Sequence, residues 1–446
     1  MLVVMCVGYF LVLLDVTIVN VALPRIGSDL GSSLSGLQWV VDGYAIALAA
    51  LMLAGGTAGD LRGHKRVVLA GLALFGAGSL GCGLAPTTGV LVLARVVQGV
   101  GAALLLPGTL AIITRTYPEA REQARAIGVW AGIGSAALPA GPLLGGALVN
   151  WVGWRSVFFL NLPIVVVAFA VATRLVRETR DPAGRRLDLA GTALGALLLA
   201  AVTFAFIEAG RDGLGPACVG AAVVSVALLV AFVLVERSHP DPTLPLSLFR
   251  RRGFSLANAT AGTMNLGTLG MLFLLTLYLQ GVRDLSPFEA GLAALPLFLP
   301  LALLAPYAGR VTAAVGPARP MVAGLLVSAA GLALLLRLDT DSGYLVLLPA
   351  LALWGLGLAA LTPAVVAAAM AAVPADRAGL ASAVNNTARQ AGGAIGIAAF
   401  GAIAGAPADG HSFVRGMHAA ALVATGMYVA AAVASAVLGG GEPGRA

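Results

Sequence analysis

Long runs of apolar residues, each close to the length of a membrane span, recur along the whole chain and are separated by short polar loops. A transmembrane helix needs roughly 20 predominantly apolar residues. Only 11% of the residues are charged, against about 25% in a soluble domain, so the chain cannot cover a large surface that faces water. The sequence therefore predicts an all-α integral membrane protein with fourteen spans. The fourteen segments are 2–23, 38–59, 66–85, 88–112, 124–148, 156–176, 189–209, 216–236, 254–280, 288–309, 320–337, 344–371, 378–403 and 416–438.

The basic residues indicate which loops face the cytoplasm. Of the 27 Lys and Arg residues, 19 fall in alternate loops or at the C-terminus, six fall in the other loops, and two lie within spans. Cytoplasmic loops carry the excess of positive charge, so both chain ends are expected in the cytoplasm, which requires an even number of spans. The predicted location is the cytoplasmic membrane, with Trp39, Trp151 and Trp154 at its outer interface.

Two long loops, 174–188 and 236–253, divide the chain into parts. Six predicted spans precede them, six follow them, and one helix pair lies between them. We therefore expect an N-terminal six-helix half at 1–176, linker loops with an extra helix pair at 177–253, and a C-terminal six-helix half at 254–446. Parallel repeats around a central site are one known plan of secondary transporters.

Three charged residues lie inside predicted spans of the N-terminal half: Asp15, Asp42 and Arg95. At 1.5 Å per residue they lie about 12, 6 and 10 Å below the outer face. A charge inside a bilayer costs roughly 2.5–3.5 kcal/mol on insertion scales, so each residue needs a partner, a water-filled cavity or, for the acids, a proton. Arginine keeps its proton but can hold a carboxylate and release it on protonation, so we expect the three to couple protons to transport. The alternatives are a packing role for Asp15 and an interfacial structural role for Asp42.

The fifth predicted span is dense in glycine and proline. Glycines four residues apart allow close helix contact, and prolines interrupt the backbone hydrogen bonds and permit a bend. Dense glycine alone indicates only packing, but a Gly-Pro pair followed two residues later by Gly-Gly is more specific. The residues of this motif are Gly141, Pro142, Gly145 and Gly146.

The loop at 56–66 combines basic residues with spaced glycines and one acid. Positive charge at this place is explained by topology alone, whereas Asp60 and the glycines are not. Asp60 could bind the positive N-terminus of another helix and hold a cytoplasmic gate shut. The predicted gate residues are Gly56, Asp60, Arg62, Gly63, Lys65 and Arg66.

Polar side chains also lie near the middle of two predicted spans, the fourth and the thirteenth. Such side chains should face a cavity or a partner, so we expect them to line a substrate cavity. The alternative is hydrogen bonding between helices with a structural role only. These residues are Gln98, Asn385, Asn386, Arg389 and Gln390.

Four of these stretches together resemble the motifs of the major facilitator superfamily and, more narrowly, of its fourteen-span drug:proton antiporter family. The loop at 56–66 is similar to the superfamily signature between spans two and three, except that Leu61 and His64 stand where basic residues are usual. The stretch 95–103 resembles the span-four motif, whose arginine is implicated in proton coupling in that family.

The other two stretches carry the narrower part of the resemblance. The stretch 137–146 resembles the antiporter motif of span five, with Ala137 in place of its first glycine, and 14–24 resembles the first-span motif of the fourteen-span group, including its acid. The resemblance implies export of lipophilic drugs or antibiotics in exchange for protons, by rocking of two six-helix halves, with the pair 189–236 peripheral. The proton gradient would supply the energy, so no cofactor is expected. The expected partners are a small organic substrate, protons and the lipid bilayer, and the protein is expected to be a monomer.

Other functional classes fit the sequence less well. A primary pump would need a G-x-x-x-x-G-K-[ST] loop, which is absent, and Lys65, the only lysine, does not follow a glycine. No zinc motif is present, so we expect no metal site. The basic residues lie where membrane topology explains them, so we expect no nucleic-acid partner. Asp339-Thr340-Asp341 could be read as the metal site of a membrane glycosyl transferase, although its neighbours favour a turn. We expect no enzyme; the alternatives are a proton-coupled exporter or importer of one metabolite, or a polytopic membrane enzyme.

Overall fold

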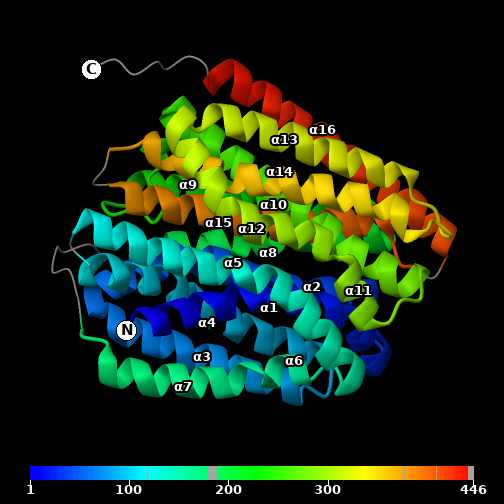
Figure 1. Ribbon diagram of the computed structural model, residues 1–446, viewed down its shortest axis with the longest axis horizontal. Helices are drawn as coiled ribbons and strands as arrows, with labels where there is room; N and C mark the ends of the chain where they lie inside the picture. The colour runs from blue at the N-terminus through cyan, green and yellow to red at the C-terminus, as the bar shows by residue number, and fades with distance from the viewer. Residues whose placement is uncertain (118, 179–187, 375–376, 408, 440–446) are drawn as a thin grey trace. The chain divides into compact units, whose positions relative to one another are not determined.

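The computed structural model describes residues 1–117, 119–178, 188–374, 377–407 and 409–439 (Figure 1). Within these ranges the regular structure is entirely helical. Twelve helices are long and apolar enough to cross a membrane, and thirteen if the bent pair Pro287–Ala293 and Leu295–Leu304 counts as one span. The prediction of an all-α, multi-pass membrane protein is confirmed. Most of the predicted loop 174–188, and Arg445 near the C-terminus, lie outside the described residues.

The predicted count of fourteen spans is not confirmed, although every predicted segment falls on a helix. The helix outside the set of thirteen is α15 (Ala378–Ala404), which is 27 residues long. Its first half contains the polar residues Asn385, Asn386, Arg389 and Gln390. These side chains lower the apolar character of the helix without shortening it.

The chain forms two compact units. The first consists of Met1–Ala205, Leu214–Leu244 and Ser286–Gly291, and the second of Phe206–Gly213, Pro245–Leu285 and Leu292–Ala446. The predicted extra pair is therefore divided, because most of it belongs to the first unit and one end of a helix to the second.

The first unit contains most of nine helices. They are α1 (Leu2–Leu30), α2 (Leu34–Arg62), α3 (His64–Leu84), α4 (Thr88–Thr116), α5 (Ala120–Trp151), α6 (Ser156–Phe159), α7 (Asn161–Leu175), α8 (Leu189–Asp212) and α9 (Pro216–Ser238). Turns between the spans are short: Gly31, with φ of 61°, ends α1, and the Ser33 side chain caps α2 by accepting from the Gly36 amide. Helices α8 and α9 are mostly exposed along their lengths.

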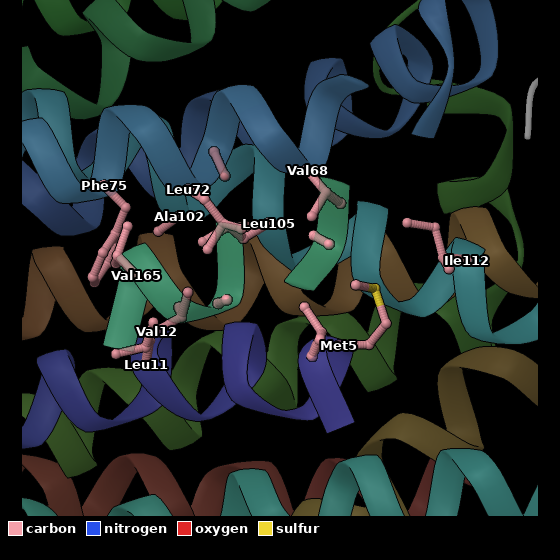
Figure 2. Close-up of a cluster of buried hydrophobic side chains, with 14 of the residues drawn as sticks. Met5, Leu11, Val12, Val68, Leu72, Phe75, Ala102, Leu105, Ile112 and Val165 are labelled. Atoms are coloured by element: carbon pink, nitrogen blue, oxygen red, sulfur yellow. The ribbon is translucent and has the colours of Figure 1, made fainter. Parts of the chain in front are cut away.

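An apolar core occupies the space between α1, α3, α4 and α7 of the first unit. Figure 2 shows side chains from these helices meeting there, among them Leu11, Leu72, Phe75, Leu105 and Val165. The cluster excludes water from the surroundings of the polar groups that the same helices carry. A charge in such surroundings interacts strongly with any fixed partner.

The second unit contains the remaining elements. They are η1 (Leu246–Arg250), α10 (Arg252–Leu277), the π-helical turn η2 (Tyr278–Val282), most of α12 (Leu295–Val315), α13 (Ala318–Leu334), η3 (Leu335–Arg337), α14 (Tyr344–Ala371), α15 (Ala378–Ala404) and α16 (Gly410–Gly439). Helix α11 (Pro287–Ala293) lies mostly in the first unit. Glycines bring α10 and α15 into backbone contact, since a Cβ at Gly392 would meet Gly262 Cα at 2.8 Å.

Candidate functional site

Two glycines in α4 fix the position of the charged site in the first unit. A Cβ at Gly99 would meet Tyr44 O of α2 at 2.5 Å, and a Cβ at Gly101 would collide with the Phe75 backbone of α3. Only glycine allows these backbones to approach so closely. Helix α4 is therefore held between α2 and α3, and Arg95 and Gln98, which precede these glycines within two turns, are buried in the interior.

Asp15 of α1 and Arg95 of α4 form an ion pair, and both side chains are 0% exposed. The pair joins Asp15 Oδ2 to a terminal nitrogen of the guanidinium group. Breaking a buried pair by removing one partner typically costs about 3–5 kcal/mol, because the other charge is left without compensation. The sequence placed these two residues at a similar depth, and the structure brings them into contact.

Gln98 extends the ion pair into a network across four helices. Its amide nitrogen donates to Asp15 Oδ1 at 2.8 Å and to Ser79 Oγ at 2.9 Å, while its carbonyl oxygen accepts from Arg95 at 2.7 Å. Asn161, the first residue of α7, donates to Ser79 Oγ at 3.2 Å. Gln98 was predicted to line a substrate cavity; the structure places it, fully buried, beside Asp15.

Arg95 also has neutral partners. Its Nε donates to the Val40 carbonyl at 3.0 Å, and its guanidinium carbon lies 4.3 Å from the centre of the Tyr44 ring. Hydrogen bonds to neutral acceptors and a π face both stabilise a buried cation. Arg95 would therefore keep several favourable contacts if Asp15 lost its charge.

Asp42 of α2 is also fully buried but lies outside this network. Neither of its carboxylate oxygens has a hydrogen-bond partner, and it forms no ion pair within the part of the chain that the structure describes. An ionised carboxylate without a partner is very unfavourable in such a place. The structure thus brings together two of the three predicted proton-coupling residues and leaves the third apart.

The glycines of the span-five motif bring α5 against α1. A Cβ at Gly145 would meet Ile18 Cγ1 at 2.8 Å, and a Cβ at Gly141 would overlap Thr17. Gly146 faces the segment Ser286–Gly291 of the same unit, through Pro287 and Phe288. Helix α5 is continuous through Pro139 and Pro142. These contacts lie on the part of α1 just after Asp15, so the motif and the ion pair share one helix.

The predicted gate loop is held by charged residues of the same unit. Asp60 lies 3.3 Å from an Arg115 nitrogen and 3.2 Å from His64 Nε2. Lys65 donates from Nζ to the Thr173 carbonyl at 2.7 Å, and its amide donates to a Glu178 oxygen at 3.0 Å. Gly56 lies in α2, which Arg62 ends.

The turn of the gate loop depends on one glycine. Gly63 has φ of 103°, and a Cβ there would overlap the Glu178 carboxylate, which also lies 3.7 Å from Arg66. In the structure, Asp60 contacts another helix through the side chain of Arg115 on α4. The contact of Asp60 with a helix N-terminus stays a prediction.

The predicted cavity residues of the second unit lie in the first half of α15. Asn385 is fully buried and donates to Asn258 Oδ1 of α10 at 3.4 Å, and Asn386 donates to the Ser382 carbonyl at 3.1 Å. Asn386, Arg389 and Gln390 are half-buried. Among the described residues, no group of three or more His, Cys, Asp or Glu side chains lies close enough to hold a metal ion.

Sequence reasoning missed Ser79 and Asn161, which complete the network around Asp15. Both are single polar residues within apolar stretches, Ser79 in α3 and Asn161 between Leu160 and Leu162. A polar side chain at such a position indicates a buried partner, so this signal was present in the sequence. It could not identify the partner.

Curated proteins of known designation are similar to this chain over most of its length. The multidrug resistance protein Stp of Mycobacterium tuberculosis (strain ATCC 25618 / H37Rv) is 39% identical over 405 residues, which are 89% of this chain and 74% of the relative. The puromycin resistance protein pur8 of Streptomyces alboniger is 40% identical over 401 residues, covering 89% and 80%. The tetracenomycin C resistance and export protein of Streptomyces glaucescens is 35% identical over 399 residues, covering 89% and 74%.

Solved structures agree with the fold. The peptide transporter POT has a TM-score of 0.69 at 17% identity, covering 98% of this chain and 95% of that chain. A bacterial homologue of the human drug peptide transporters has a TM-score of 0.66 at 16% identity, covering 98% and 96%. Residues 5–397 match the sequence model of the Major Facilitator Superfamily. The superfamily expected from the sequence motifs is thus confirmed, and the chain belongs to the Major Facilitator Superfamily.

Proposed function

We propose that this protein exports lipophilic drugs or antibiotics across the cytoplasmic membrane in exchange for protons, and that Asp15 is the group that carries the proton. The names of three relatives describe drug or antibiotic resistance, and one of them describes export. None of these three names describes an enzyme. The role of the proton is inferred from the geometry of the site around Asp15.

The observation that carries the proposal is the buried contact between Asp15, Arg95 and Gln98. Among the three, only Asp15 can change its charge at physiological pH, because arginine stays protonated and an amide does not titrate. When Asp15 takes a proton, the ion pair is lost while Arg95 keeps Val40, Gln98 and the Tyr44 ring as neutral partners. The site therefore has two charge states with different contacts between α1 and α4.

The energy of the buried ion pair and the energy of one charge crossing the membrane potential are of similar size. Losing a buried ion pair changes the free energy by about 3–5 kcal/mol. One elementary charge that moves across 100 mV supplies about 2.3 kcal/mol. Protonation of Asp15 can therefore shift the balance between two arrangements of the helices, as alternating access requires.

The polar half of α15 supplies the proposed substrate contacts. Asn386, Arg389 and Gln390 are half-buried, whereas Asn385 is buried and donates a hydrogen bond to Asn258 of α10. Apolar walls with a few polar groups suit a lipophilic substrate. We assign Gln98 to the proton site instead, since its amide nitrogen and its carbonyl oxygen are both bonded there.

Membership of the fourteen-span drug:proton antiporter family is part of the proposal. Helix α15 has 27 residues and is about 40 Å long at 1.5 Å per residue, more than the roughly 30 Å hydrocarbon core. Its polar residues are those that a substrate cavity requires. Counting α15 and the bent pair as spans gives the predicted fourteen. This even number leaves both chain ends on one side of the membrane, and the excess of basic residues in alternate loops favours the cytoplasmic side.

The test uses acid-loaded inverted membrane vesicles that contain the wild type, Asp15→Asn or Asp212→Asn. Asp212 is a matched control, because its side chain is 61% exposed and lies at the end of α8. A panel of lipophilic antibiotics is added and proton release is recorded with a pH-sensitive dye, normalised to the amount of folded transporter.

Proton release by the wild type and Asp212→Asn, with none from Asp15→Asn, is the expected result. An equal response of Asp15→Asn would refute the role of Asp15. A response of the opposite sign, with protons entering alongside the compound, would identify an importer and overturn the proposed direction.

A further inference from the structure

The second unit carries an open groove between α12, α13 and α14. Its volume is about 450 Å³. The residues that form its walls are nearly all apolar, among them Leu304, Val311 and Val315 of α12, Ala323 of α13, and Leu356 and Ala360 of α14.

The groove extends along α12 from Leu304 to Val315, the last residue of that helix. Eleven steps of 1.5 Å give a length of about 16 Å. The predicted span ends at residue 309, so Leu304 lies within the hydrocarbon region and Arg310 follows at the membrane surface. The groove therefore leads from the membrane surface into the hydrocarbon region.

The outer rim of the groove is uncovered. Leu304, Val311 and Val315 of α12 are 41%, 52% and 46% exposed. In a membrane-spanning segment such a face meets lipid, and a groove in that face accepts an acyl chain more closely than a flat helix surface does.

Two arginines stand at the membrane-surface end of the groove. Arg319, the second residue of α13, lines the groove itself, and the Arg310 guanidinium lies 5.5 Å from the centre of the Tyr307 ring, which also lines it. Neither arginine forms an ion pair with any residue that the structure describes, and the sequence has no Asp or Glu between Glu289 and Asp339. Among the described residues, no acidic partner therefore compensates the positive charge at this end.

We propose that this groove binds one anionic phospholipid, with an acyl chain along α12 and the phosphate between Arg310 and Arg319. A phosphate accepts hydrogen bonds from guanidinium groups. A zwitterionic lipid carries its own cation beside the phosphate, so two uncompensated arginines favour a lipid with net negative charge. Each basic residue near an anionic headgroup contributes about 1 kcal/mol, which corresponds to roughly five-fold in affinity.

The test is native mass spectrometry of the purified full-length protein, titrated with phosphatidylglycerol or with phosphatidylethanolamine of the same acyl chains. The wild type should retain one phosphatidylglycerol about 25-fold more strongly than phosphatidylethanolamine, from two arginines at five-fold each. The double variant Arg310→Gln/Arg319→Gln should lose this preference. Arg337→Gln, at the other end of α13 and also without an acidic partner among the described residues, should keep it.

A second variant tests the acyl-chain part of the site. Ala323→Phe fills the groove without altering charge and should weaken retention of both lipids to a similar extent. Equal retention of the two lipids by the wild type would overturn the proposal. So would an unchanged preference in the double variant, or an equal loss in Arg337→Gln.

Discussion

Helices α1 and α5 of the first unit can be compared with α10 and α15 of the second, because glycines bring both pairs into backbone contact. A Cβ at Gly145 would meet Ile18 of α1, and one at Gly396 would meet Leu266 of α10. The polar groups beside the two contacts differ in kind. The first unit buries an ion pair at Asp15, whereas the second buries the two amides Asn258 and Asn385.

This difference separates two physical tasks. An aspartate can gain or lose a proton and so change its contact with Arg95, while an amide keeps one charge state at all pH values. In α16 of the second unit, His411 lies 3.9 Å from Asp339 and both side chains are exposed. Under the proposed function, this difference in buried chemistry assigns the response to protons to the first unit and the contact with a neutral or lipophilic molecule to α15 of the second.

The largest expected effect comes from removing the arginine of the buried pair. Arg95→Gln should lower the free energy of unfolding by about 3–5 kcal/mol, because Asp15 is left buried without a cation. Asn385→Ala in the second unit should cost only about 1 kcal/mol, the usual size for a neutral hydrogen bond. Both are measured by unfolding purified protein in mixed micelles with increasing sodium dodecyl sulfate.

The control for this comparison is Arg155→Gln, since Arg155 pairs with Asp29 at 2.7 Å on an exposed surface. Exposed pairs contribute about 0–1 kcal/mol. If Arg95→Gln were no more destabilising than Arg155→Gln, the buried pair would not distinguish the two units.

The next effect should be equal in the two units. Gly141→Val and Gly396→Val each place side-chain atoms against a neighbouring backbone or side chain, so each should destabilise by about 1–3 kcal/mol. The controls are Gly128→Ala in α5 and Gly309→Ala in α12, where a Cβ would meet nothing within 4 Å. A clear loss in one unit and none in the other would show that the two helix pairs do not share a packing mechanism.

These contacts also show how far the sequence determined the site. Hydropathy identified the long helices, and the depths of Asp15 and Arg95 indicated that they could meet, since a charge in a bilayer needs a partner. Depth does not fix the direction of a side chain around its helix. Asp42 was therefore grouped with the pair although it lies apart, and Gln98 was assigned to a cavity although it bonds to Asp15.

A smaller effect is expected from the outer part of the network. Ser79→Ala removes the hydroxyl that accepts from Gln98 and Asn161, so the free energy of unfolding should fall by about 1 kcal/mol. Proton release should decrease only in part, because Gln98 keeps its bond to Asp15. Ser328→Ala, at a buried serine of the second unit, provides a comparison. An unchanged proton response in the second variant, with a reduced one in Ser79→Ala, would assign the network to coupling rather than to packing.

The smallest change in stability should come from Asp42→Asn. Its carboxylate has no hydrogen-bond partner among the described residues, so the amide replaces it without breaking a contact. The free energy of unfolding should therefore not fall, because an unpaired buried carboxylate is itself unfavourable. A loss of several kcal/mol would instead place Asp42 in a structural network like that of Asp15. Recording proton release from the same variant sharpens the comparison further. A stable protein with reduced proton release would make Asp42 a second proton site, separate from the ion pair, because a carboxyl group without a buried cation beside it can take up and lose a proton without rearranging α1 and α4.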